Sequence, residues 1–325
     1  MTAARDGESG TLRPTRRPLP WQASFALLAA IWGCSFWWIK LGDAMLAPVQ
    51  VAFARVAIGA LTLLAVSAVT RTRLPRGLTT WRHLFVVSLL FNSIPFSLFA
   101  IGETHVSSVV AGLINAMTPL TTLVVVMTAY REEQPTGDRL AGLLVGFVGA
   151  LVVIGVWSGL GRGELLGAAA CFGAVVSYGL AFPYLRRHLT GLPDGMIALT
   201  TGQIVCAAIT LLPLAVLAGP PGPVRADAMT AMVALGGLGT GIAYLLSFRV
   251  ISLAGSTTAS TVTYVIPLFA VVVGVLFLGE QIGCNEPVGG LIVLAGAAIA
   301  HGRARSTGAA LARCAGVRWE ASAEG

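Results

Sequence analysis

The sequence carries little charge for its length. Asp, Glu, Lys and Arg make up 11% of its 325 residues, whereas about 25% is usual in soluble globular proteins. The apolar fraction is 56% and the mean hydropathy is +0.82. The charges collect at the two ends and in short clusters between apolar runs. This composition excludes a soluble enzyme, a disordered protein and a disulfide scaffold, and it indicates an integral membrane protein with several spanning helices.

Cysteine and histidine are also scarce, with five and four residues. An odd number of cysteines, most of them inside apolar runs and without a Cys-x-x-Cys motif, fits neither a disulfide framework nor a zinc site. The sequence has no His-Glu-x-x-His motif and no Gly-x-x-x-x-Gly-Lys phosphate-binding loop. We therefore expect no metal ion, no cofactor and no enzymatic activity. The net charge of +7 is scattered over many loops, which argues against nucleic acid as a partner.

Ten apolar runs are each long enough to cross the roughly 30 Å hydrocarbon core of a lipid bilayer as a helix. They lie near residues 21–41, 48–69, 83–101, 106–129, 140–157, 165–185, 195–217, 229–250, 255–278 and 287–302. The only break between the third and fourth runs is Gly102-Glu103-Thr104-His105, which predicts a tight turn. The predicted fold class is an all-α integral membrane protein with ten transmembrane helices.

The distribution of basic residues predicts the orientation of these helices, since cytoplasmic loops are enriched in Lys and Arg. With the N-terminus inside, 17 of the 21 basic residues fall on inner loops and on the two tails. The outer loops then hold only Arg162 and Arg225. We therefore expect a multi-pass protein of the cell membrane with both tails, residues 1–20 and 303–325, in the cytoplasm.

The chain also repeats itself at a spacing of about 148 residues. The matching pairs at that spacing are Pro119 and Pro267, Glu132 and Glu280, and Gly142 and Gly290, and Trp32-Gly33 matches Tyr178-Gly179 at 146. Two repeats of five helices follow, at residues 21–157 and 165–302. Because five is odd, the second repeat enters the membrane from the opposite side. Inverted repeats of this kind build many secondary transporters.

Four stretches of the sequence together resemble a known family. They are Trp-Gly-Cys-Ser-Phe at 32–36 with Lys40, Pro48 followed by Arg55, residues 107–120 running on to Arg131-Glu132-Glu133, and residues 256–280. The sequence resembles the drug/metabolite transporter superfamily, specifically proteins with two EamA domains, over about residues 22–302. The resemblance implies a ten-helix bundle that exports amino acids, other small metabolites or drugs through the cytoplasmic membrane.

Two prolines in corresponding helices are candidate hinges. Pro119 and Pro267 each lack an N–H, so each is expected to free a backbone carbonyl inside its helix. Freed carbonyls within a bilayer tend to face protein or a wet cavity. Asn115 and Tyr264 lie at the same depth and are candidate substrate contacts. The alternative is a pair of inert kinks filled by Ser and Thr.

Arg55 lies seven residues inside the second predicted helix. An arginine within a span is costly, so we expect it to face the interior of the bundle. It is an anchor for a substrate carboxylate, a gate that changes partner between states, or a member of a fixed ion pair, with Glu103 and Asp43 as candidate partners. Glu103 and His105 are candidates for proton coupling, since histidine titrates near neutral pH. The alternative places both as solvated turn residues.

Other polar and aromatic residues lie inside the predicted spans. Asn92 and Gln203 carry amides that must be hydrogen-bonded in hydrocarbon, so they are either ties between helices or substrate contacts. Tyr178 and Tyr244 either line a cavity or pack. Glycines at 142–149 and at 290–296 predict close helix packing, within one chain or across a homodimer.

The sequence favours a secondary active transporter that moves a small-molecule substrate by alternating access, with a proton as a candidate coupled ion. A membrane-embedded enzyme is a second hypothesis, but the spans hold no cluster of catalytic groups. A channel is a third, against which the inverted repeats and paired prolines argue. The sequence does not identify the substrate.

Overall fold

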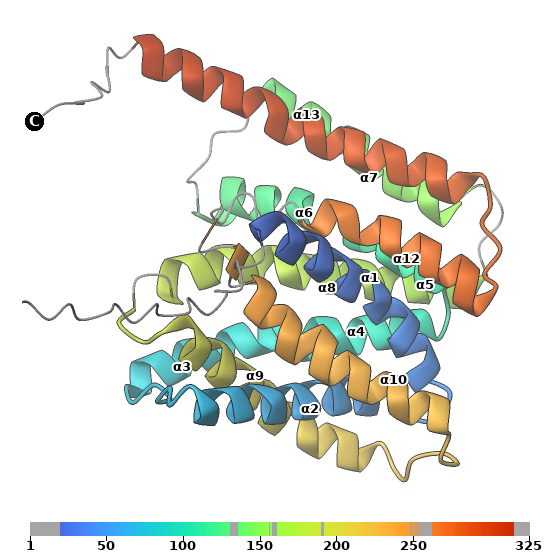
Figure 1. Ribbon diagram of the computed structural model, residues 1–325. Coiled ribbons are helices and arrows are strands. Elements are labelled where there is room, and N and C mark those ends of the chain that lie inside the picture. The colour runs from blue at the N-terminus through green and yellow to red at the C-terminus, as the bar shows by residue number, and fades with distance from the viewer. Residues whose placement is uncertain are drawn as a thin grey trace, which may run out of the picture.

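A computed structural model of the chain describes residues 20–130, 136–155, 157, 161–189, 192–247, 249–250, 253 and 262–314, with side chains as far as Ile299 except that of Tyr130. Its helices are α1 (Trp21–Gly42), α2 (Pro48–Val69), α3 (Leu78–Ser88), α4 (Ile94–Glu103), α5 (Ser108–Asn115), α6 (Thr118–Val125), α7 (Gly137–Ile154), α8 (Arg162–Leu189), α9 (Met196–Leu217), α10 (Ala226–Gly236), α12 (Val262–Leu278) and α13 (Asn285–Cys314), with π-helical segments η1 (Leu89–Ser93), η2 (Val126–Tyr130) and η4 (Gly237–Ile242). Figure 1 shows them running along one common direction as a bundle.

Eight helical segments of the described residues are long and apolar enough to cross a membrane. Three of these join shorter elements, namely α3–η1–α4, α5–α6–η2, and α10–η4 with the helical residues that follow it. The shorter apolar helices Val262–Leu278 and Asn285–Ile299 complete the ten. The described residues contain no strand. The predicted all-α fold is confirmed, although residues 255–261 of the ninth run lie outside the described residues.

The fourth run is interrupted near its middle. α5 ends at Asn115, and α6 begins at Thr118 after a short turn. Pro119 therefore lies in the first turn of α6, where a missing N–H costs nothing. The expectation that Pro119 sits inside a continuous helix is wrong, whereas Pro267 does lie inside α12. The carbonyl of Asn115 accepts a hydrogen bond from Thr118 Oγ1 at 2.8 Å.

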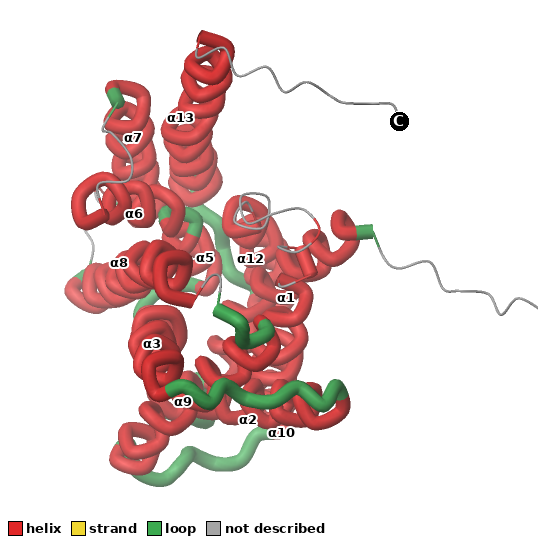
Figure 2. Tube along the Cα trace, turned by 90° about the vertical axis from the view of Figure 1, so that its left-hand side faces the viewer, coloured by secondary structure: helices red, strands yellow, loops and turns green. Residues whose placement is uncertain are grey.

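The two repeats exchange helix contacts in a symmetrical way. In the first repeat α1 packs on α12 and α10, and in the second repeat its counterpart α8 packs on α6 and α4. The equivalent helices α2 and α9 pack on each other, as do α7 and α13. Figure 2 looks along the bundle and places α7 and α13 at one edge, with α2, α9 and α10 at the opposite one. This is the arrangement of two inverted five-helix repeats related by a pseudo-two-fold axis.

Two glycines at equivalent positions let these helices approach closely. A methyl group in place of the hydrogen of Gly33 in α1 would lie 2.9 Å from the carbonyl oxygen of Ile266 and would also meet Phe269. A methyl group on Gly179 in α8 would lie 2.8 Å from Thr121 Oγ1. Thr121 and Phe269 are 148 residues apart, so the same contact occurs in both repeats. Small residues at such positions permit close helix packing.

The edge pair α7 and α13 also meets through glycine. A side chain on Gly149 would lie 2.6 Å from the backbone nitrogen of Val293 and 2.9 Å from the carbonyl oxygen of Gly289. Close packing between the glycine-rich parts of these two helices is therefore confirmed. The contact joins two helices of one chain, as Figure 1 shows, and so it does not by itself call for a second copy.

Candidate functional site

A small cavity lies near the centre of the bundle, where both repeats contribute. Its volume is about 80 Å³. The residues that line it are Trp32, Ser35, Phe36 and Ile39 of α1, Arg55 of α2, Phe91 of η1, Phe96 and Phe99 of α4, Asn115 of α5, Thr118 of α6, Tyr178 and Phe182 of α8, Tyr244 after η4, and Thr263 and Ile266 of α12. Aromatic rings form most of its wall, and one described lining residue, Arg55, is charged.

Arg55 is held in place by two neighbours from different repeats. Its Nε donates a hydrogen bond to Thr240 Oγ1 at 3.1 Å, and its guanidinium carbon lies 3.7 Å from the ring centroid of Phe96. The side chain is only 7% exposed. Among the described residues it forms no ion pair, so the predicted partnership with Glu103 or Asp43 does not occur as a salt bridge. A buried cation without a counter-charge is costly.

A chain of three side chains forms a second polar element beside the cavity. Gln203 Nε2 donates to Asn92 Oδ1 at 2.6 Å, and Asn92 Nδ2 donates to the hydroxyl oxygen of Tyr244 at 2.7 Å. Asn92 is fully buried. Asn92 and Gln203 therefore tie helices together in this structure, and Tyr244 carries the chain to the cavity wall. The π-helical turn η1 places Asn92 toward these partners; such turns often occur at functional sites.

The predicted site residues fall into two groups. Arg55, Asn115, Tyr178 and Tyr244 line the cavity, and Asn92 and Gln203 lie directly behind it. Tyr264 lies elsewhere, packed with Leu120, Leu123 and Ala297. The structure thus brings six of the seven predicted contact residues together around one space.

Each of the two prolines directly follows a residue that lines the cavity. Pro119 follows the lining residue Thr118, and Pro267 follows the lining residue Ile266. Pro119 lies in α6, one short turn after Asn115, and Pro267 lies in α12, which also carries Thr263. Their role as hinges remains a prediction.

Glu103 and His105 differ sharply in their surroundings. His105 is exposed in the turn between α4 and α5. Glu103 is the last residue of α4 and is 0% exposed, and neither of its carboxyl oxygens has a hydrogen-bond partner among the described residues. The reading of Glu103 as a solvated turn residue is therefore wrong, because α4 extends through it and packs it inside.

The turns around Glu103 are tied together by side-chain contacts. We call this region, residues 43–47, 104–107, 218–225 and 279–284, the Glu103 end of the bundle. Lys40 Nζ donates to the carbonyl oxygens of Glu103 and Val106, the latter at 3.1 Å. Glu280 accepts hydrogen bonds from Ser108 N at 2.9 Å, Ser108 Oγ at 3.0 Å and Val109 N at 3.1 Å. Glu280 thereby caps the N-terminus of α5, where negative charge is favourable.

Two further hydrogen bonds at the same end join the turns that follow α1 and α9. Gln50 Nε2 donates to the carbonyl oxygen of Gly219 at 2.7 Å, and Gly222 N donates to the carbonyl oxygen of Met45 at 2.8 Å. These contacts join the turns at the Glu103 end, and we call this arrangement the closed form of that end.

Sequence reasoning did not single out two residues that hold Arg55. Thr240 is 148 residues from Asn92, and Phe96 is 148 residues from Tyr244. Applying the repeat spacing to the two polar candidates would have pointed to both. The phenylalanines of the wall carried no signal, since an aromatic residue in an apolar run is usually packing.

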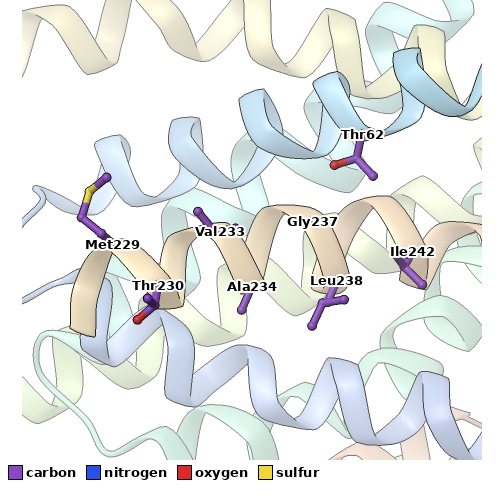
Figure 3. A pocket seen from close by; sticks show the side chains of 8 residues that line it. All are labelled: Thr62, Met229, Thr230, Val233, Ala234, Gly237, Leu238 and Ile242. Atoms are coloured by element: carbon purple, nitrogen blue, oxygen red, sulfur yellow. The ribbon is translucent and has the colours of Figure 1, made fainter. Parts of the chain in front are cut away.

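A larger but shallow groove of about 540 Å³ lies on the outside of the bundle. It is lined by Thr62 of α2 and by residues of α10 and η4, as Figure 3 shows. The lining residues are Thr62, Met229, Thr230, Val233, Ala234, Gly237, Leu238 and Ile242. Thr62 Oγ1 already donates to the carbonyl of Ile58 in its own helix at 2.9 Å. No charged group lies in this groove, so it has no means of orienting a polar substrate.

The described residues contain no group of three or more His, Cys, Asp or Glu that could hold a metal ion.

The family model described as the EamA-like transporter family matches residues 20–155 and 165–301. An uncharacterized transporter of Archaeoglobus fulgidus is 25% identical over 280 residues, which cover 83% of this chain and 93% of the relative. The uncharacterized transporter YdfC of Bacillus subtilis is 26% identical over 277 residues, covering 84% and 88%.

A third relative has a more specific name. A protein of Streptantibioticus cattleyicolor, named a probable terminal-alkyne amino-acid exporter, is 29% identical over 204 residues, covering 62% of this chain and 67% of the relative. Among solved structures, one crystal structure matches with a TM-score of 0.63 and 17% identity, covering 88% of this chain and 98% of the other. That likeness concerns the fold alone.

Proposed function

The chain belongs to the EamA-like transporter family, and we propose that it is a secondary active transporter that carries a small organic acid, of the amino-acid class, across the cell membrane by alternating access. The observation that supports this substrate class is Arg55 in the cavity wall. Its one hydrogen bond within the described residues uses Nε. The remaining guanidinium nitrogens are available for a carboxylate, which Arg can bind with two parallel hydrogen bonds.

The remainder of the cavity suits an apolar or aromatic substrate body. Rings from α1, α4 and α8 surround the space, and Phe91 and Tyr244 close its side. Hydroxyl and amide groups of Ser35, Asn115 and Thr263 supply the few polar contacts that fix orientation. The name of the Streptantibioticus cattleyicolor relative, an amino-acid exporter, agrees with this substrate class and favours export as the direction.

The cavity is too small for such a substrate in the form described. Its volume of about 80 Å³ compares with roughly 300–1,000 Å³ for ligand pockets. Substrate entry therefore requires helices to separate, as alternating access demands. In inverted-repeat transporters this is largely a rocking of one set of helices against another around a fixed site.

The orientation in the membrane is part of the proposal. The arginines of the α2–α3 connection and of the last turn of α8 lie at the end opposite to Glu103, whereas Arg162 and Arg225 lie at the Glu103 end. The positive-inside rule then places the Glu103 end outside and both tails in the cytoplasm. Cysteine labelling in cells is expected to place Gly161 and Ser306 on opposite sides. Labelling of both from one side would contradict the inverted arrangement.

The decisive experiment is substrate counterflow in proteoliposomes with pooled radiolabelled amino acids and monocarboxylates, followed by the single compounds that exchange. Arg55→Gln is expected to lower the affinity for the transported acid by roughly ten- to a hundredfold, the value of one charged hydrogen-bonded contact. Arg55→Lys is expected to recover part of it, since lysine keeps the charge but lacks the planar fork.

The matched control is Arg225→Gln. Arg225 is exposed, pairs with Asp227 at 2.7 Å and is not among the residues that line the cavity. It is expected to transport normally. Full activity in Arg55→Gln, with the protein folded and inserted, would leave Arg55 with a structural role and refute the proposed carboxylate site.

A further inference from the structure

Glu103 presents an unusual situation at the closed end of the bundle. Its carboxyl group is fully buried, and both oxygens lack a hydrogen-bond partner among the described residues. An ionised carboxylate in such a place bears the whole cost of lost hydration, of several kcal/mol at least. A neutral carboxylic acid bears far less. The closed form therefore requires a proton on Glu103.

Neither neighbouring cation forms an ion pair with the carboxylate of Glu103 among the described residues, although both charges favour its ionised form. The titratable groups that face Glu103 are Lys40 of α1, Asp43 after α1, Arg55 of α2, Cys171 of α8 and Glu280 after α12. Lys40 is engaged with the carbonyl oxygens of Glu103 and Val106. Arg55 is engaged with Thr240 and Phe96. The three carboxyl groups, Glu103, Asp43 and Glu280, outnumber the two cations, Lys40 and Arg55.

Asp43 follows α1 at the Glu103 end of the bundle, and its charge acts on Glu103. Both of its carboxyl oxygens are also buried without a partner. Burial raises the pKa of Asp43 to about 7, against the opposing effect of the Lys40 charge. Two carboxyl groups in one place cannot both ionise cheaply. A charge on Asp43 therefore makes ionisation of Glu103 still less favourable.

We propose that Glu103 is a proton-binding site of this transporter and that it must be occupied for the Glu103 end to close. When that end opens, water reaches the carboxyl group, and Glu103 releases its proton to the water and becomes a carboxylate. Before that end closes again, the carboxylate takes a proton from the water on the same side. Closure therefore binds one proton and opening releases it, so the proton controls closure without crossing the membrane. The role of Glu103 in a transport cycle rests on the proposed function. The link between protonation of Glu103 and closure does not depend on it.

Linkage fixes the sign of the pH effect. Because the closed form binds one proton more than the open form, raising the pH favours the open form. Once Glu103 ionises in the open form, the ratio of open to closed protein rises by up to roughly tenfold for each pH unit. A neutral isostere removes this dependence and holds the end closed.

The first test reads the proton directly. Infrared difference spectra of the purified protein in lipid, without substrate, are recorded between about pH 6 and about pH 9. The spectra are recorded in an Asp43→Asn background, because protonated Asp43 would contribute a band of the same kind. The carbonyl band of protonated, non-hydrogen-bonded Glu103 is then expected at neutral pH. It should vanish in Glu103→Gln, shift in Glu103→Asp and persist in the exposed control Glu164→Gln. A band that persists unchanged in Glu103→Gln, or that is absent from the parent protein at every pH, would overturn the proposal.

The second test reads closure, using a native cysteine as the reporter. Cys171 is 0% exposed and packs against Gly102, next to Glu103. In a background without the other four cysteines, maleimide labelling of Cys171 is compared between the parent and Glu103→Gln at each pH, so that the intrinsic reactivity of the thiol cancels. The labelling ratio of parent to variant is expected to rise with pH.

Two outcomes separate this proposal from its rivals. If Asp43→Asn abolishes the pH dependence in labelling while Glu103→Gln keeps it, the proton site is Asp43 and the proposal for Glu103 is wrong. A ratio that does not change with pH is equally contrary to it. Both tests omit substrate, so they can succeed even if the counterflow experiment shows no carboxylate transport, and they can fail even if it does.

Discussion

Two hydrogen bonds between the repeats occupy equivalent places in the molecule but differ in charge. In one, Arg55 of α2 donates to Thr240 of η4; in the other, Gln203 of α9 donates to Asn92 of η1. Arg55 and Gln203 are 148 residues apart, and so are Asn92 and Thr240. The inverted repeat has therefore duplicated the contact and changed its chemistry.

The aromatic neighbours follow the same rule. Phe96 lies under the guanidinium of Arg55, and its equivalent at a spacing of 148 is Tyr244, whose hydroxyl accepts from Asn92. One side of the cavity thus carries a cation on a ring, and the other a neutral amide and a phenol. Under the proposed function, the backbone symmetry would serve the motion of the repeats, and the broken chemical symmetry would give the substrate one orientation, with its carboxylate toward Arg55.

The strongest test of this comparison moves the charge from one place to the other. Arg55→Gln alone is expected to lower the affinity for the transported acid by the roughly ten- to hundredfold stated above, because neither place then holds a cation. Adding Gln203→Arg puts an arginine beside Asn92 and the ring of Tyr244, where a cation–π contact is again available. Counterflow should recover in part in the double variant. If counterflow in the double variant stays as low as in Arg55→Gln, positions 55 and 203 are equivalent in backbone structure but not in their ability to bind the substrate.

The next test asks whether the packing of the two repeats is as symmetrical as the contacts indicate. Gly33→Leu and Gly179→Leu each force a side chain into a helix backbone, and overpacking of this kind costs about 1–3 kcal/mol. Thermal unfolding in detergent should show a similar loss for both. Gly137→Leu is the control, since no atom lies within 4 Å of a methyl group there. A loss confined to one variant would show that one repeat tolerates separation of its helices.

These expectations also show what the sequence could and could not predict. Periodic apolar runs predict the ten helices, since length and hydropathy alone decide whether a segment crosses a bilayer. The repeat spacing predicts the inversion. Arg55, Asn115, Tyr178 and Tyr244 could be selected because a polar group within a span is costly and is retained for a reason.

Other features depend on packing that no local pattern reveals. The π-helical turns η1 and η4 begin 148 residues apart, at Leu89 and Gly237, and they turn Asn92 and Thr240 inward; neither sequence carries a recognisable signal for this. Glu103 follows a glycine near a turn, which suggested a solvated residue, but the final turn of α4 is covered by α8 and buries it. Tyr264 resembles the other candidates in sequence and differs only by the face on which it falls.

A smaller effect compares the two neutral partners of these bonds. Asn92 joins Gln203 and Tyr244, whereas Thr240 serves Arg55 alone among side chains. Side-chain hydrogen bonds between membrane helices are worth about 0.6 kcal/mol on average and up to about 1.7. Asn92→Leu is therefore expected to destabilise the protein about twice as much as Thr240→Val. Chemical unfolding in mixed micelles measures the difference, and equal losses would contradict the count of contacts.

The smallest expected effect concerns the prolines, which the repeat spacing pairs but the helices treat differently. Pro119 lies in the first turn of α6, so Pro119→Ala restores no hydrogen bond that the helix lacks. Pro267 lies inside α12, where its ring excludes one backbone hydrogen bond. Pro267→Ala should straighten and stiffen α12, with alanine as the best helix former.

The measurable consequence of that difference is a change in the balance between open and closed forms. Labelling of Cys171 at one fixed pH should differ from the parent in Pro267→Ala and match it in Pro119→Ala, by a factor of a few, because a local change of about 1 kcal/mol shifts a two-state equilibrium about fivefold. The flexibility of the fourth helix would then come from the break after Asn115, and that of the ninth from its proline. Matching shifts in both variants would show instead that the two prolines act as a symmetrical pair of hinges despite their different places in the helices.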